Sequence, residues 1–119
     1  MPRLMSVALT EQAVVERRKT VTRRLGWKFL KAGDRLTLCR KVMGRKKGET
    51  LVRLAEVEVV DVRREPLYRI DLADVRREGF DDMLPSDFIE FFVKHMRCHI
   101  SDEVTRIEWR YLDPKENKQ

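Results

Sequence analysis

The chain has 119 residues, of which 42% are apolar and 39% charged, and its formal net charge is +6 at pH 7. This length suits one domain with its own core, and this apolar content excludes a disordered chain. The positive charge favours a phosphate-bearing partner, because basic residues recur along the chain. The basic clusters are Arg17-Arg18-Lys19, Arg23-Arg24, Arg45-Lys46-Lys47, Arg63-Arg64 and Arg76-Arg77. The alternative is a solvated surface on which acidic side chains neutralise most of this charge.

Nothing in the sequence predicts export or membrane insertion. Two cysteines, Cys39 and Cys98, are too few for a disulfide framework. The apolar run over residues 4–9 is too short for a secretory signal or a membrane span. We therefore expect a cytoplasmic protein with no membrane partner. We expect one domain over residues 1–113 and a frayed polar tail over residues 114–119.

The first third of the chain predicts a strand followed by a helix. Residues 4–9 are apolar and predict a buried strand, and Thr10 is a candidate N-cap for a helix over residues 11–16. The β-branched run Thr20-Val21-Thr22 indicates that the chain has left this helix.

The middle of the chain predicts a hairpin with an irregular second strand. A turn at residues 32–34 precedes a predicted strand over residues 35–43, and the glycine-bounded loop 44–48 turns the chain back. Residues 51–63 are strand-like, but their apolar positions change from even to odd numbers and back again. Such changes of phase predict β-bulges, which bend the strands of small barrels.

The last third predicts two helices and a closing strand. Asp71 is a candidate cap for a helix over residues 72–78 that Gly79 ends. A second helix, near residues 87–96, begins either at Pro85 or after Ser86 as its cap. The side chains that it is expected to bury are Phe88, Ile89, Phe92, Val93 and Met96. Residues 104–112 alternate as a strand with Ile107, Trp109 and Tyr111 on one face and Arg106, Glu108 and Arg110 on the other.

This order of elements lacks the regular βαβ rhythm of a parallel sheet. It predicts an α+β fold: a small, mostly antiparallel β-barrel with flanking helices.

The basic stretch after the first helix carries the most specific motif. Lys19, Thr22 and Arg24 fit the pattern Gly-x-Lys-x-x-Glu/Thr-x-Arg, with Arg17 where the pattern has glycine, and a Lys-x-Gly-Asp turn follows at residues 31–34. On these residues, the chain resembles the ASCH domain over about residues 5–112. ASCH domains are related to the PUA domains of RNA-modifying proteins. The resemblance implies a PUA-like β-barrel and a cleft suited to RNA, a nucleotide or a modified nucleoside. Glycine at position 17 would allow a positive φ or a close approach to ligand, so Arg17 is a departure from the pattern.

One enzymatic branch of that family removes the acetyl group from N4-acetylcytidine with a lysine, a threonine and a glutamate. The resemblance implies Lys19 as the base, Thr22 as the nucleophile and, by order along the chain, Glu78 as the proton donor. A lysine pKa falls on desolvation or beside cations, so Lys19 suits the role physically. Residues three apart point to opposite faces of a strand, so Lys19 and Thr22 cooperate only if the chain turns between them. Glu78 would end a helix, where the dipole disfavours a carboxylate.

The leading hypothesis is an RNA- or nucleotide-binding domain with a basic cleft lined by Lys19, Thr22, Arg24 and Glu78. Further candidate ligand contacts are Arg18, Arg23, Trp27, Arg45, Lys46 and Lys47. Trp27 either stacks on a base or belongs to the core. The alternatives are an amidohydrolase acting on N-acyl nucleosides and a small protein-interaction or inhibitory module with Phe91 on its contact surface. A ribonuclease is less favoured, because the sequence shows no convincing histidine pair.

A small cluster of His95, Cys98 and His99 raises the question of a metal. Zinc needs four ligands, usually in paired spacings, and Cys39 is the only plausible fourth. We therefore predict no metal and no cofactor.

Overall fold

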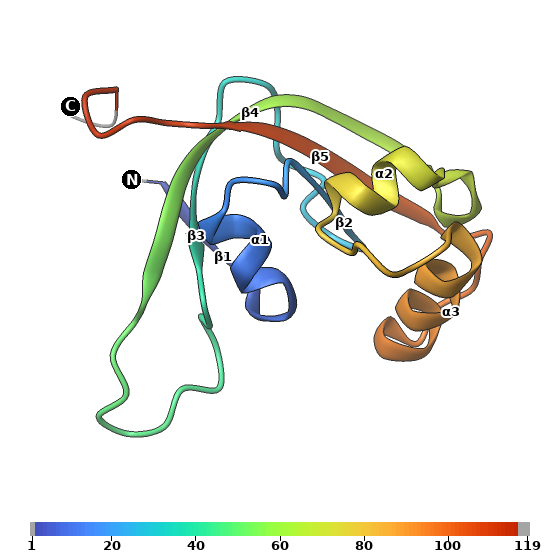
Figure 1. Ribbon diagram of the computed structural model, residues 1–119, viewed down its shortest axis with the longest axis horizontal. Coiled ribbons are helices and arrows are strands. Elements are labelled where there is room, and N and C mark those ends of the chain that lie inside the picture. The colour runs from blue at the N-terminus through green and yellow to red at the C-terminus, as the bar shows by residue number, and fades with distance from the viewer. Residues whose placement is uncertain (1, 117–119) are drawn as a thin grey trace.

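A curled sheet organises the chain in the computed structural model, which describes residues 2–116. Within that range the sheet has five strands in the order β1-β3-β4-β5-β2. They are β1 (Arg3–Ser6), β2 (Val21–Arg24), β3 (Arg35–Cys39), β4 (Arg53–Pro66) and β5 (Glu103–Tyr111). β1 pairs with β3 in parallel, and the other pairings are antiparallel. The long strands β4 and β5 cross the molecule side by side (Figure 1). The sheet forms a half-barrel with edge strands β1 and β2, which confirms the predicted α+β, PUA-like fold class.

The irregular strand β4 bends at a bulge. Val59 pairs with Trp109 and Asp61 pairs with Glu108, so Val60 has no partner on β5. The extra residue moves the inward-facing set of side chains from odd to even positions. The second of the two phase changes predicted from the sequence is therefore a bulge, and the first coincides with a register shift that leaves Leu54 without a partner on β3. The strand before the hairpin is shorter than predicted, since β3 ends at Cys39.

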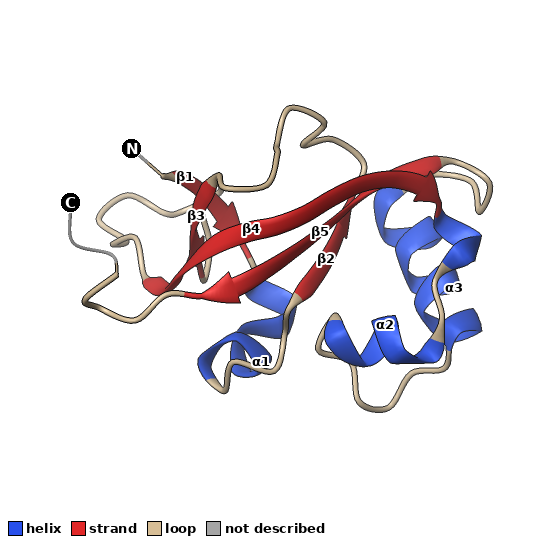
Figure 2. Ribbon diagram, turned by 90° about the horizontal axis from the view of Figure 1, so that it is seen from above, coloured by secondary structure: helices blue, strands red, loops and turns tan. Residues whose placement is uncertain are grey.

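Helices flank one side of the long strands (Figure 2). They are α1 (Glu11–Val15), α2 (Leu72–Arg77) and α3 (Pro85–Met96), with 3-10 turns η1 (Ala8–Thr10) and η2 (Leu67–Arg69) before the first two. The strand expected over residues 4–9 ends at Ser6, because the backbone turns at Val7 into η1. Thr10 makes no capping hydrogen bond with its side chain, which is buried instead.

The local signals around α2 and α3 are confirmed. The Asp71 side chain accepts a hydrogen bond from the Asp74 N–H at 2.8 Å, and Gly79 follows the helix with φ +101°. α3 begins at Pro85, and the Asp87 carboxylate accepts a hydrogen bond from the Leu84 N–H. Met96 is not buried as expected: it lies at the last turn of α3 and is 38% exposed.

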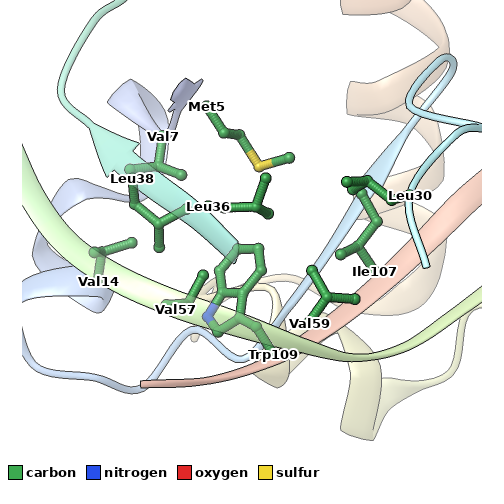
Figure 3. Packing of buried hydrophobic residues seen from close by; sticks show 10 residues of the cluster. All are labelled: Met5, Val7, Val14, Leu30, Leu36, Leu38, Val57, Val59, Ile107 and Trp109. Atoms are coloured by element: carbon green, nitrogen blue, oxygen red, sulfur yellow. The ribbon is translucent and has the colours of Figure 1, made fainter. Parts of the chain in front are cut away.

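The buried apolar side chains form two clusters. The first fills the curl of the half-barrel and includes Leu36, Leu38, Val57 and Trp109 (Figure 3). The second joins α2 and α3 to the start of β5 through Val75, Phe88, Phe92 and Val104, among others. A fully buried leucine or phenylalanine stabilises the fold by about 1.5–3 kcal/mol, so α2 and α3 are held firmly against the sheet.

The described end of the chain is tied to the sheet. Residues 114–116 form a turn, in which Glu116 pairs with Arg110 at 2.8 Å and accepts a hydrogen bond from Arg35 through its backbone. The rest of the expected tail, residues 117–119, lies outside the described residues. The thiols of Cys39 and Cys98 are free. No helix within residues 2–116 has the length and apolar character needed to cross a membrane.

Candidate functional site

A cavity of about 360 Å³ opens between the two edge strands of the half-barrel. One wall comes from the end of β1 and from η1, a second from β2, and a third from α3 with the segment that precedes it. The polar side chains of its lining include Lys19, Thr22, Arg24 and Glu78. The structure therefore brings the three residues of the motif and the distant Glu78 around one space.

Lys19 is held at both its backbone and its side chain. Nζ donates hydrogen bonds to the Glu78 backbone oxygen at 2.7 Å and to Glu78 Oε1 at 3.0 Å. The Lys19 carbonyl oxygen accepts from Trp109 Nε1 at 3.0 Å and from the Tyr111 hydroxyl. The side chain is 3% exposed. The backbone of Lys19 is thus fixed against β5, and its amine against the end of α2.

A turn after α1 allows Lys19 and Thr22 to reach the same cavity. Arg17 has φ +60°, its N–H donates to the Val14 carbonyl, and the Arg18 N–H donates to the Ala13 carbonyl. This is a Schellman motif, in which the residue after the C-cap adopts the left-handed conformation that glycine favours. The backbone here has the geometry expected of the family's glycine, although the chain carries arginine. This turn lies before Lys19 and not between Lys19 and Thr22; Lys19 precedes β2, which begins at Val21, and both Lys19 and Thr22 line the cavity.

Burial lowers the pKa of Lys19, because the ammonium is desolvated. The Glu78 carboxylate opposes this effect through its charge and hydrogen bond, and the neighbouring Arg24 adds to the lowering. The result is a pKa below the ordinary lysine value. This agrees in direction with the pKa change expected from the sequence, but desolvation contributes more than the cationic neighbour.

Glu78 reaches Lys19 because α2 ends against α1. Glu78 is the C-cap of α2, and Gly79 next to it lies where an added Cβ would sit 2.8 Å from the Ala13 Cβ. The carboxyl group is buried, and Oε2 has no hydrogen-bond partner among the described residues. A buried acceptor without a donor is costly, and here it belongs to a residue that lines the cavity.

Arg24 links the two edges of the half-barrel. Its Nε donates to Thr22 Oγ1 at 3.2 Å, and its Nη2 donates to the Ser6 carbonyl of β1 at 2.7 Å. No strand pairing joins β2 to β1, so the guanidinium closes part of the gap. Because Thr22 Oγ1 accepts from Arg24, its own hydroxyl proton remains available for another acceptor.

Arg23 lines the cavity, and carboxylates of the surrounding fold compensate its charge. Its guanidinium pairs with Asp74 at 2.8 Å and with Glu65 at 2.7 Å, and its side chain is 1% exposed. Arg106 also pairs with Asp74, at 2.7 Å. Burial alone would raise the pKa of Asp74, but hydrogen bonds from Arg106, Arg77 and Arg23 hold it well below its usual range.

The remaining candidate contacts do not line the cavity. Arg18 is exposed and pairs with Glu16 and Asp81. Trp27 is half-buried and packs against the first core cluster. The three basic residues Arg45, Lys46 and Lys47 are exposed in the β3–β4 loop, which extends away from α3 (Figure 1). The structure therefore does not bring Arg45, Lys46 and Lys47 to the cavity lining, and their role as ligand contacts stays a prediction.

One wall of the cavity is aromatic, and its residues were not among the site residues predicted from the sequence. Phe80, Phe88 and Phe91 line the cavity with ring centroids 5.7–6.4 Å apart, and His95 stacks on Phe91 at 5.3 Å. The spacing of Phe88, Phe91 and His95 along α3 was the available signal, because it places them on one helical face. Phe91 is half-buried in this wall, which removes the exposed position that a protein-contact role required.

The described part of the chain holds no cluster of three or more His, Cys, Asp or Glu side chains suited to a metal ion. His95 belongs to the aromatic wall, while the His99 ring bonds Ser101.

A half-barrel with this strand order and helix placement is the fold of ASCH domains. The chain is similar to a protein of the DUF984 family from Enterococcus faecalis, with TM-score 0.69, 16% identity, and coverage of 95% of this chain and 81% of that one. It is similar to an ASCH domain from Lactobacillus crispatus, with TM-score 0.62, 11% identity, and coverage of 87% and 70%. It is also similar to ASCH from Zymomonas mobilis, with TM-score 0.60, 12% identity, and coverage of 98% and 80%. At these identities the likeness concerns the fold alone. No family model matches the sequence, and no curated protein matches it significantly.

Proposed function

We propose that the cavity binds a nucleoside, or the nucleoside part of a nucleotide or RNA. The observation that carries the proposal is the pairing of an aromatic wall with a polar one. Phe80 and Phe91 supply aromatic rings, while Lys19 and Glu78 supply a donor and an acceptor. A flat ring with a polar edge matches both walls. The volume, about 360 Å³, is at the small end of the range for ligand sites, about 300–1,000 Å³.

The polar wall favours a ligand without a phosphate inside the cavity. Arg23 is neutralised by Asp74 and Glu65, and the charge of Lys19 is matched by Glu78. Arg24 directs two donors at protein atoms. The groups that remain for the ligand include one ammonium proton of Lys19, the hydroxyl proton of Thr22 and the unpartnered Oε2 of Glu78. A ligand N–H would give Glu78 its missing hydrogen bond.

Calorimetric titration with cytidine, N4-acetylcytidine and cytidine 5′-monophosphate tests this proposal. Phe91→Ala should weaken nucleoside binding by about tenfold, since loss of a stacking partner costs about 1–3 kcal/mol. Tyr68→Ala, at an exposed aromatic outside the cavity lining, is the matched control and should change nothing. Equal affinity in Phe91→Ala and the unmodified protein, or binding of inorganic phosphate alone, would contradict the proposal.

A second candidate function is hydrolysis of an N-acyl nucleoside. The buried Lys19 amine, the Glu78 carboxyl and the Thr22 hydroxyl line one cavity, and burial lowers the pKa of Lys19. Proton transfer along the 3.0 Å Lys19–Glu78 hydrogen bond would convert the ion pair into an amine and a carboxylic acid. The first is the base that a threonine nucleophile needs, and the second is the acid that a leaving amine needs.

In that reaction Thr22 Oγ attacks the acyl carbon as its proton passes to Lys19 Nζ. The C–N bond breaks as Glu78 gives its proton to the leaving nitrogen, which leaves a threonyl ester. Water then cleaves the ester, releases the carboxylic acid and restores the protonation of the site. Arg24, which donates to Thr22 Oγ1, is a positioning residue.

Release of acetate from N4-acetylcytidine tests this second function. Thr22→Val should abolish release while Thr22→Ser retains it, because serine keeps the hydroxyl at nearly the same place. Glu78→Gln should slow release by about 10²–10⁴-fold, the contribution typical of a proton donor. Unchanged turnover in Thr22→Val would exclude the nucleophile, and binding without any turnover would leave only the first function.

A further inference from the structure

An exposed patch of aromatic and basic side chains lies outside the cavity lining. It consists of Arg3, Trp27 and Phe29, which together with Leu4 and Gly26 line a shallow hollow on the surface. The Phe29 side chain is 54% exposed, and the Arg3 guanidinium lies over its ring, 4.3 Å from the centroid. The Trp27 ring is 5.5 Å from the Phe29 ring and tilted by 34°. We call these three residues the Trp27–Phe29 patch.

The backbone presents these rings at some cost. Trp27 has φ +60°, a conformation that a bulky side chain rarely adopts. The loop after β2 thereby keeps Phe29 at the surface, while Leu30 beside it is buried in the core. An exposed phenylalanine loses the stabilisation that burial would give. Trp27 packs partly against the first core cluster, whereas the exposed Phe29 ring lies outside it.

The charge that is not compensated around the patch is positive. Lys31, Arg35 and Arg53 border an adjoining hollow that also contains Arg3 and Phe29. The acidic side chains of this hollow are fewer than its basic ones, and two of the three are paired: Asp34 with Lys31 at 3.7 Å and Glu58 with Arg110, which leaves Glu56. No carboxylate within residues 2–116 forms an ion pair with Arg3, Lys28 or Arg53.

We propose that the Trp27–Phe29 patch binds single-stranded nucleic acid. Unpaired bases stack on exposed aromatic rings, and the phosphates that link them contact neighbouring basic side chains. A duplex hides its base faces and would use only the charges. An acidic peptide would likewise use Arg3 and Arg53 but would not need the Phe29 ring. This site goes beyond the nucleoside cavity and does not depend on it, since the two share no lining residue.

Fluorescence anisotropy with labelled oligo(U) and oligo(dT) tests the proposal on the intact protein. Phe29→Ala should weaken binding by about tenfold, from the loss of base stacking. Arg3→Gln should reduce the slope of log affinity against log salt by about 0.7, the value for one contact with a single strand. In NMR spectra, the Trp27 indole N–H signal should shift on binding, while that of the buried Trp109 should stay.

The turn η2 offers a matched control pair. Tyr68 is 51% exposed, close to the exposure of Phe29, and Arg69 beside it is exposed like Arg3. Tyr68→Ala and Arg69→Gln should leave affinity within about twofold, because each ring–base stack is local. Equal losses at both places would show unspecific attraction and overturn the proposal. The proposal would also be overturned if a duplex or polyglutamate bound as tightly as the single-stranded oligonucleotides, or if neither oligonucleotide bound.

The cavity and the patch are separable in the same assays. Phe29→Ala should leave nucleoside affinity unchanged, and it should weaken oligonucleotide binding by the same factor in the Phe91→Ala background as in the unmodified protein. If no nucleoside binds but oligo(U) binding depends on Phe29, only the function proposed for the cavity fails.

Discussion

Replacing Gly79 by alanine tests how α1 and α2 are fitted together at the cavity. Gly79 has φ +101°, and a Cβ there would lie 2.8 Å from the Ala13 Cβ and 3.4 Å from Thr10 Cγ2. The positive φ costs alanine about 1–2 kcal/mol. The overlap costs about 1–3 kcal/mol, because α1 has to move. Loss of unfolded-state freedom offsets about 0.4–1 kcal/mol, so the free energy of unfolding should fall by about 3 kcal/mol.

Gly33→Ala separates the two contributions. Gly33 has φ +97°, but nothing lies within 4 Å of its Cβ position. Only the backbone strain remains there, so the expected loss is about 1 kcal/mol. Urea unfolding followed by tryptophan fluorescence measures both values, since Trp109 is 2% exposed in the folded chain.

A double-mutant cycle gives the sharper result. Ala13→Gly removes the methyl group that Gly79→Ala would strike, so the double variant should recover about 1–3 kcal/mol relative to the sum of the single losses. Equal losses in Gly79→Ala and Gly33→Ala, together with zero coupling to Ala13→Gly, would refute the close approach of α1 and α2 as the reason for glycine at this position.

Other predictions concern the buried charges and the turn after α1. Burial lowers the pKa of Lys19, so the unfolded chain binds that proton more tightly and the free energy of unfolding should rise with pH up to about 10.4. In the double variant Lys19→Met/Glu78→Gln, urea titrations at successive pH values should no longer show this increase in the free energy of unfolding. An unchanged increase would show that another group causes it. Because its arginine partners hold the pKa of Asp74 below its usual range despite burial, stability from Asp74 should be present above about pH 4 and fall away below it. Asp74→Asn should lower the free energy of unfolding by about 3–5 kcal/mol at pH 7 and weaken its decrease at acid pH. A decrease under 1 kcal/mol at pH 7 would contradict the buried ion network. At position 17 φ is +60°, so the free energy of unfolding in urea should be about 1 kcal/mol higher for Arg17→Gly than for Arg17→Ala. The reverse order would argue against the left-handed turn.

The sequence predicted best those features that depend on neighbouring residues. The Asp71 cap, the Gly79 stop and the bulge in β4 follow from local hydrogen bonding, from φ and from side-chain alternation. Arg17 does not belong with them: the sequence marked it as a departure from the pattern, yet its backbone has the positive φ that the pattern's glycine would allow.

Features that depend on tertiary packing were predicted less well. Arg23 and Arg24 are adjacent and chemically identical, yet one pairs with Asp74 and the other reaches the carbonyl of Ser6. Alternation places them on opposite faces of β2, but the sequence does not say what lies on each face. Phe91 is a similar case, because its role as cavity wall depends on the packing of α3 near η1. A cluster of basic residues in the sequence is therefore not enough to locate a phosphate-binding site.

The two oxygens that hold Lys19 have different origins. One belongs to the Glu78 side chain, but the other is the Glu78 backbone carbonyl, and the Lys19 carbonyl is itself bonded to Trp109 and Tyr111. The location of the amine is therefore largely a property of the main chain and of β5. Position 78 is open to chemical variation: exchange of its carboxyl group alters charge and proton supply while leaving a main-chain acceptor for the lysine.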